Sequence, residues 1–238
     1  MKKSLFRTGL IDGIPIAAGY FAVSFSFGIA AAAAGIPAFE AIMISMTNLT
    51  SAGQFAAIGI ISAGGAYFEM ALTQLIINLR YALMGLSLSQ KLDKSFTRIH
   101  SLVLGHAVTD EIFAVAMSRS KAIRPLYFLG LAALPYICWS AGTAAGALLG
   151  GLLPEPVASA LSVSLYGMFI AIVVPAAKKS RAVLCVTALA VILSCIIYYT
   201  PALGFISSGF SVIICAVIAS TAGAVFFPVK EGSEVSGE

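Results

Sequence analysis

Apolar stretches recur along almost the whole 238-residue chain, separated by short breaks rich in glycine, proline or charge. Each stretch is long enough to cross roughly 30 Å of hydrocarbon as a helix. Helices are expected rather than strands, because backbone groups in lipid need internal partners and the chain lacks the polar alternation of a barrel. The expected segments cover residues 12–34, 38–63, 67–89, 99–118, 125–150, 156–177, 182–199 and 203–227.

This pattern predicts an all-α, polytopic integral membrane protein with about seven or eight transmembrane helices and at least one interrupted or re-entrant segment. Composition agrees, since 60% of the residues are hydrophobic and 10% are charged, against about 25% charged in an average soluble domain. We expect a single transmembrane domain over residues 1–229 and a polar cytoplasmic tail over residues 230–238. The first apolar run is expected to remain as a helix rather than be cleaved as a signal peptide, because more spans follow it.

Basic residues indicate the orientation of the chain. Twelve of the 14 lysines and arginines form four trios, and because basic loops stay in the cytoplasm, both termini are predicted to be cytoplasmic. The segment over residues 99–118 has basic residues on both sides. Either it crosses and the preceding trio lies outside, or two segments within residues 38–118 re-enter without crossing. Segment lengths favour seven or eight spans. The trios are Lys2, Lys3, Arg7; Lys91, Lys94, Arg98; Arg119, Lys121, Arg124; and Lys178, Lys179, Arg181.

The motif Asn78-Leu79-Arg80-Tyr81 places a cation within an apolar segment. Ionisable residues at membrane depth cost about 2.5 to 3.5 kcal/mol each on insertion scales, so they are candidates for function. A guanidinium beside an amide can bind a carboxylate through paired hydrogen bonds, which makes Asn78 and Arg80 candidate substrate ligands. The alternatives are that Arg80 extends to the membrane interface or pairs with an acidic residue.

Two adjacent carboxylates, Asp110 and Glu111, lie within the fourth apolar segment. They point about 100° apart on a helix, so at most one of them faces a given cavity. A carboxyl group in a low-dielectric site can bind and release a proton during transport, which makes both residues candidates for proton coupling. The alternative, an ion pair with Arg80, is compatible with this role. His106 lies one turn before Asp110, where it can join a relay or serve packing.

Small hydroxyl and amide residues gather in the middle of the second segment, over residues 47–54. A helix broken there exposes backbone groups that can bind a polar ligand, so a break is predicted near residues 50–53. The alternative is a contact between helices through small residues. The candidate substrate ligands in this stretch are Asn48, Thr50, Ser51, Gly53 and Gln54.

In these motifs the sequence resembles the AzlC-type large subunit of bacterial branched-chain amino-acid exporters. The order and spacing of the motifs and the length of the chain agree with that family. The resemblance implies export of leucine, isoleucine, valine or similar small apolar solutes, driven by an ion gradient. It also implies a small, separately encoded AzlD-type membrane subunit as a partner. The matching pieces are residues 50–55 (Thr-Ser-Ala-Gly-Gln-Phe), residues 78–81, Thr109-Asp110-Glu111 with Phe113, and Trp139 with Thr143 and Gly146.

The predicted function is therefore a secondary transporter for an amino-acid substrate, surrounded by lipid in the bacterial cytoplasmic (inner) membrane. The sequence has no nucleotide-binding motif, so a gradient or a partner must supply the energy. Nucleic-acid binding is not expected. The four cysteines and two histidines form no metal-ligand pattern, so no metal, cofactor or enzymatic activity is expected. A membrane-embedded enzyme and a channel-like subunit are the alternative functions.

Overall fold

The computed structural model describes residues 2–152, 154, 156, 170, 173–178 and 180–228. All named elements in these residues are helices, which confirms the predicted all-α class. The segment expected over residues 156–177 lies mostly outside the described residues and the tail over 230–238 wholly outside them, so the total of seven or eight spans stays a prediction. Within the described part of the chain, five helices are long and apolar enough to cross a membrane: α1 (Lys2–Ala33), α4 (Tyr67–Ser89), α7 (Pro125–Leu149), α9 (Arg181–Tyr199) and α10 (Ser208–Phe226).

Two of the expected segments are each divided into a pair of short helices. The first interruption, at residues 48–50, lies in the predicted polar stretch but begins two residues before the predicted position, so Gly53 is helical. The second, at residues 106–109, is not anticipated by the sequence pattern. It ends where the Thr109 hydroxyl accepts a hydrogen bond from the Ile112 amide and starts a new helix. The four short helices are α2 (Ala38–Thr47), α3 (Ser51–Ser62), α5 (Arg98–Gly105) and α6 (Asp110–Ser118).

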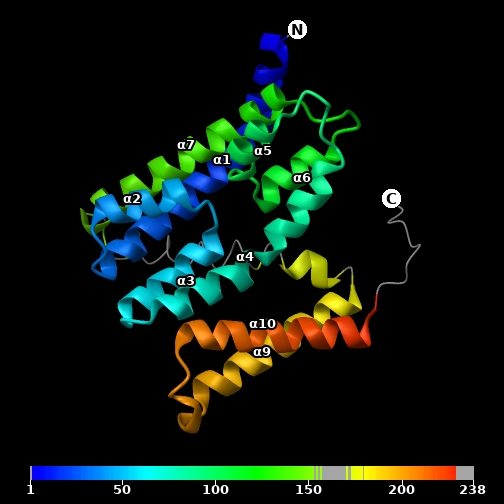
Figure 1. Cartoon of the computed structure of the whole chain (residues 1–238). Coiled ribbons are helices and arrows are strands. Elements are labelled where there is room, and N and C mark those ends of the chain that lie inside the picture. Colours follow the sequence, from blue (N-terminus) through cyan, green and yellow to red (C-terminus); the bar gives the residue numbers. More distant parts are fainter. Residues whose placement is uncertain are drawn as a thin grey trace. The chain divides into compact units, whose positions relative to one another are not determined.

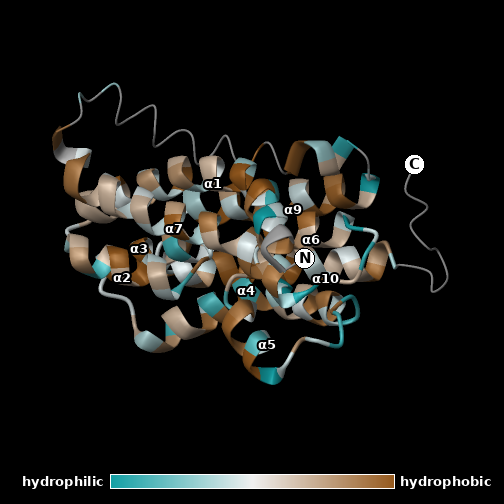
Figure 2. Ribbon diagram, turned by 90° about the horizontal axis from the view of Figure 1, so that it is seen from above, coloured by the Kyte–Doolittle hydropathy of each residue, from teal (hydrophilic) through white to brown (hydrophobic). Residues whose placement is uncertain are grey.

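The chain divides into two compact units (Figure 1). Unit 1 comprises Met1–Ile58 and Ile77–Leu165, and unit 2 comprises Gly59–Ile76 and Tyr166–Glu238. Hydrophobic residues make up much of the helices (Figure 2). On α4 they follow one helical face, which suits contact with lipid or with another membrane helix. The exposed leucines of that face are Leu75, Leu79, Leu83 and Leu86.

Unit 1 is built on α1 and α7, which lie side by side and run in the same direction (Figure 1). Glycines allow their backbones to touch. A Cβ atom on Gly13 would lie 2.7 Å from the Leu131 carbonyl oxygen, and one on Gly28 would lie 2.6 Å from the Ala147 amide nitrogen. Residue numbers rise together along both helices, so the packing is parallel. Membrane helices commonly associate through small residues in this way.

The loops that precede α5 and α7 pair with each other at the N-terminal end of α7. The Asp93 amide donates to the Ile123 carbonyl at 2.8 Å, and the Ile123 amide donates to the Lys91 carbonyl at 2.9 Å. Hydrogen bonds from Ser95 hold the pKa of Asp93 below its usual value, so this carboxylate stays charged beside the basic residues. Both ends of residues 98–118 therefore lie at the same end of unit 1.

The α2–α3 pair packs near the other end of α1. Ala41 of α2 and Phe55 and Ile58 of α3 pack in one cluster with Phe27 and Ala31 of α1. The Phe55 ring lies edge-on to the Phe27 ring, with the centroids 5.6 Å apart. Residues before and after the first interruption thus contact the same part of α1.

Unit 2 contains α9 and α10, which pack against each other, and the first part of α4. Gly223 allows a close approach, since a Cβ atom there would lie 2.7 Å from Val186 Cγ2 of α9. Ser180 caps the start of α9, and a short 3₁₀ turn, η2 (Pro201–Leu203), leads from its end toward α10. None of the α9 residues is buried within the described part of the chain, so this helix offers its surface to lipid or protein.

A methyl group at Gly28 is predicted to force α1 away from α7. We expect Gly28→Ala to destabilise the protein by about 1–3 kcal/mol, the usual cost of overpacking a tight contact. The measurement is the unfolding midpoint of the purified protein in detergent. Gly19→Ala is the matched control on the same helix, because no atom lies within 4 Å of its Cβ position. Equal midpoints for the two variants would contradict the packing described here.

Candidate functional site

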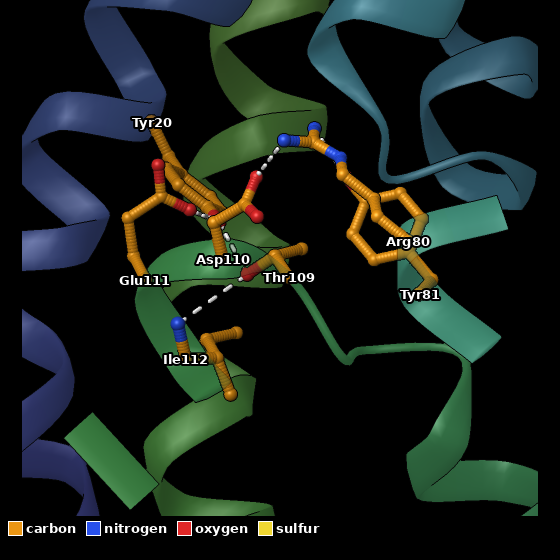
Figure 3. A network of polar contacts seen from close by, with 7 residues as sticks. All are labelled: Tyr20, Arg80, Tyr81, Thr109, Asp110, Glu111 and Ile112. Carbon is orange, nitrogen blue, oxygen red and sulfur yellow. Dashed lines mark hydrogen bonds and ion pairs between the residues drawn. The ribbon is translucent and has the colours of Figure 1, made fainter. Parts of the chain in front are cut away.

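An ion pair between Arg80 and Asp110 forms the centre of the candidate site (Figure 3). Arg80 Nη1 of α4 lies 2.7 Å from Asp110 Oδ2 of α6, an ion pair that the sequence analysis gave as an alternative to a role in substrate binding. The guanidinium also lies 5.0 Å from the centroid of the Tyr81 ring and donates to the Tyr81 hydroxyl at 3.2 Å. The side chains of Arg80 and Asp110 are 42% and 31% exposed, so a ligand can reach both charges.

The first turn of α6 supplies both predicted carboxylates and directs them to different partners (Figure 3). Asp110 faces α4, whereas Glu111 faces Tyr20 of α1. The Tyr20 hydroxyl lies 2.6 Å from Glu111 Oε2 and 2.5 Å from Thr109 Oγ1. A phenol has a single hydrogen, so Tyr20 donates to the carboxylate and accepts from Thr109.

The interruption between α2 and α3 is held by a chain of buried polar side chains. Gln54 Nε2 donates to Ser45 Oγ at 2.8 Å, and Trp139 Nε1 donates to Gln54 Oε1 at 3.0 Å. The Ser45 and Thr143 hydroxyl oxygens lie 2.7 Å apart. Gln54 has no exposed surface, so these bonds fix the orientation of its amide. At the break itself, the Thr50 hydroxyl donates to Asn48 Oδ1 at 2.8 Å.

The two interruptions meet midway along α7. Met46, near the end of α2, has a carbonyl oxygen that accepts from the Tyr136 hydroxyl at 2.9 Å and lies 3.2 Å from His106 Nε2. A carbonyl can only accept, so His106 carries its hydrogen on Nε2 in this contact. The sequence left the role of His106 open, and the structure places it in this backbone contact. The Tyr20 and Trp139 rings lie edge to face, 5.1 Å apart, and so join the polar groups of the two interruptions.

A second ion pair lies one-third of the way along α1. Arg119 Nη1 lies 3.2 Å from Asp12 Oδ2, and the Tyr127 hydroxyl donates to the same oxygen at 2.8 Å. The Arg119 guanidinium also lies over the Tyr127 ring, 4.0 Å from its centroid. The sequence reasoning counted Arg119 only as a loop charge and did not consider Asp12. The sequence signal that could have identified this pair is an acidic residue at the start of the first apolar segment.

The predicted site residues fall into two groups. Arg80, Asp110 and Glu111 surround the start of α6, while Asn78 lies half a turn before Arg80 on α4. The candidates of the second segment lie at the first interruption and in the first turn of α3. Tyr20 and Ser45 belong to these networks but were not identified from the sequence, because a lone tyrosine or serine in an apolar helix carries no distinguishing pattern. The second group consists of Asn48, Thr50, Ser51, Gly53 and Gln54.

Apolar spanning helices around an internal polar site define a polytopic helical membrane protein. The chain belongs to the AzlC family, whose model, described as AzlC protein, matches residues 15–153. It is 33% identical to an uncharacterized membrane protein of Archaeoglobus fulgidus, over 74% of this chain and 78% of that protein. It is 28% identical to the inner membrane protein YgaZ of Escherichia coli, over 78% of each chain. No solved structure matches it.

The Arg80–Asp110 pair is predicted to show energetic coupling. Arg80→Gln leaves the Asp110 carboxylate without its cation, so it should lower the free energy of unfolding. Adding Asp110→Asn removes that unpaired charge and should recover part of the loss. Because both side chains are partly exposed, we expect a coupling of about 1 kcal/mol in a double-mutant cycle measured by unfolding in detergent. Strictly additive effects would show that the pair contributes nothing to stability.

Proposed function

We propose that this protein is a secondary transporter that exports branched-chain or similar small apolar amino acids. In this proposal an ion gradient drives export, and a small AzlD-type membrane subunit is the partner. The observation that supports it most is the partly exposed Arg80–Asp110 pair, which holds a cation and an anion side by side among apolar helices. Membership of the AzlC family is consistent with a role in membrane transport.

An amino acid is a zwitterion, and the ion pair offers a partner for each of its charges. Arg80 is the proposed ligand of the substrate carboxylate, because its planar guanidinium can form two parallel hydrogen bonds. Asp110 is the proposed ligand of the substrate ammonium group. When the substrate binds, two ion pairs with the substrate replace the Arg80–Asp110 pair. These pairs offset part of the free energy needed to remove the substrate charges from water. The branched side chain needs only an apolar surface, which the surrounding helices supply.

Asp110 can couple the substrate to protons, because its carboxylate accepts either a proton or the ammonium group. A proton and the substrate ammonium group therefore cannot bind Asp110 at the same time. Such exclusive binding is required for a transporter that moves protons and substrate in opposite directions. Protonation of Asp110 would also release Arg80 from its ion pair. Glu111, which is bonded to Tyr20, is the second proposed proton site.

The residues of the first interruption are the proposed orienting groups of the site. Asn48 and Thr50 lie at the break, and Ser51 and Gly53 lie in the first turn of α3. Gln54 acts in this proposal through its bonds to neighbouring side chains, which hold the break open. Together with Asn78 on α4, these groups would bind polar parts of the substrate.

The proposed arrangement in the membrane contains two re-entrant hairpins. Both ends of residues 98–118 lie with the paired basic loops, which favours entry and exit on the cytoplasmic side. Nine helical residues in α6 cover about 14 Å, roughly half of the hydrocarbon thickness. The α2–α3 pair contacts the other end of α1 and would enter from the opposite side. The hairpin tips would then meet at mid-depth, where discontinuous helices of transporters bind their substrates.

The transport proposal predicts a sharp effect of Arg80→Lys. Lysine keeps the positive charge but lacks the planar pair of donors, so we expect the initial export rate to fall about tenfold or more. The measurement is efflux of labelled leucine, isoleucine and valine from loaded vesicles that contain the protein, with and without the small subunit. Arg98→Lys, at the start of α5 beside the basic loop, is the matched control and should keep the parent rate. If Arg80→Lys exported amino acids at the parent rate, Arg80 would not be a substrate ligand.

The hairpin proposal predicts that the two flanks of residues 98–118 lie on the same side of the membrane. In a cysteine-free background, cysteines replacing Gln90 and Ser120 should both resist an impermeant external thiol reagent in intact cells. A cysteine replacing Ala66, between α3 and α4, should react. If residues 98–118 crossed the membrane once, Gln90 and Ser120 would differ in reactivity. That outcome would show that this segment crosses the membrane once and does not form a hairpin.

A further inference from the structure

Glu69 is a buried carboxylate in the first turn of α4, within unit 2. It is 6% exposed, although Tyr67 and Phe68 beside it are 95% and 70% exposed. Its Oε1 atom accepts hydrogen bonds from the Ser207 hydroxyl and, at 3.2 Å, from the Gly209 amide, both at the start of α10. Within the described part of the chain, no basic residue forms an ion pair with Glu69. A carboxylate buried without a cation is uncommon and suggests a function.

A second buried oxygen lies beside this carboxylate. Thr73, one turn further along α4, has no exposed surface, and its hydroxyl finds no hydrogen-bond partner among the described residues. A Cβ atom at Gly209 would lie 2.5 Å from Glu69 Oε1 and 2.8 Å from Thr73 Oγ1. The two side chains therefore converge on the backbone of Gly209, and any larger residue there would collide with both.

Among the described residues, the segments that contact Glu69 carry no charged side chains. Residues 59–66, before α4, and residues 200–214, at the start of α10, contain no Asp, Glu, Lys, Arg or His. Tyr198 and Tyr199 at the end of α9 are 82% and 76% exposed. The charged form of Glu69 is thus stabilised by two hydrogen bonds and by the N-terminus of α10, not by an opposite charge.

We propose that Glu69 is a proton-binding site, with Thr73 as the hydrogen-bond acceptor of the protonated form. In the charged form, Ser207 and Gly209 donate to Glu69 Oε1. On protonation, water delivers a proton to the carboxylate, and the new O–H group donates to Thr73 Oγ1. Release returns the proton to water, so no other reactant takes part. A carboxylate that served only to cap α10 would have no use for a buried hydroxyl beside it.

The position of Glu69 suggests which side of the membrane supplies the proton. Glu69 is at the start of α4, and the basic loop at Lys91 follows the end of that helix. In the proposed topology α4 crosses the membrane, which would place Glu69 toward the face opposite the basic loops. For gradient-driven export this is the face from which protons enter. This role in coupling rests on the proposed transport function, whereas the proton site itself does not.

Infrared difference spectroscopy tests the proton site without any transport measurement. The full-length protein in lipid nanodiscs is titrated with acid in H₂O and D₂O, and the carbonyl band of protonated carboxylic acids is followed. Glu69→Gln should remove one isotope-sensitive component of this band. Glu40→Gln is the matched control, because Glu40 is also the third residue of its helix but is exposed. It should leave the buried-acid component intact, and an unchanged band in Glu69→Gln would overturn the proposal.

Two neighbouring variants keep the proposal testable if Glu69→Gln does not fold. Thr73→Val removes the acceptor of the protonated form and should lower the titration midpoint by about one pH unit, a tenfold change in proton affinity. Ser207→Ala removes a donor to the charged form and should raise the midpoint by a similar amount. Midpoints equal to the parent in both variants would overturn the proposal.

The two proposals fail in different ways. If the parent protein moves no amino acid in vesicles but shows the Glu69 band, the transport function is wrong and the proton site stands. If it transports and the band does not depend on Glu69, the proton site is wrong and the transport function stands.

Discussion

The close parallel packing of α1 against α7 is the interaction on which the rest of unit 1 depends. Side chains from these two helices hold both ends of α6 and the first interruption. Tyr20 and Asp12 of α1 hold the two ends of α6 through Glu111 and Arg119, while Trp139 of α7 holds the first interruption. Glycines bring the two backbones into contact, so the positions of these side chains along the helix axes are fixed relative to one another. A slip of one helical turn, about 5.4 Å, would separate every pair.

The interruptions follow from the same constraint that makes the spans helical. In lipid, a backbone group that leaves a helix needs another partner inside the protein. The Met46 carbonyl is bonded to His106 and Tyr136, and the Thr109 side chain caps the new helix. Each break thus brings polar side chains to a depth where an uninterrupted helix would present none.

Three acidic residues of this chain have different surroundings and, with them, different chemistry. Asp110 faces a guanidinium that a zwitterion could replace. Glu111 accepts from the phenol of Tyr20, which holds it in a fixed position. Glu69 has only neutral donors and lies beside an unpaired hydroxyl. We propose that Asp110 binds either an ammonium group or a proton, and that Glu111 and Glu69 bind a proton.

The sequence by itself determined that the chain is a helical membrane protein, because nearly every segment is too apolar for water and long enough for lipid. It also identified Arg80, Asp110 and Glu111, since charges in apolar segments need partners. The apolar pattern of residues 99–118 concealed their interruption, because that break depends on contacts from Tyr20 and Met46, which are far away in the sequence. Only the tertiary structure decided which carboxylate meets Arg80, because adjacent residues differ by about 100° and the neighbouring helix selects one of them.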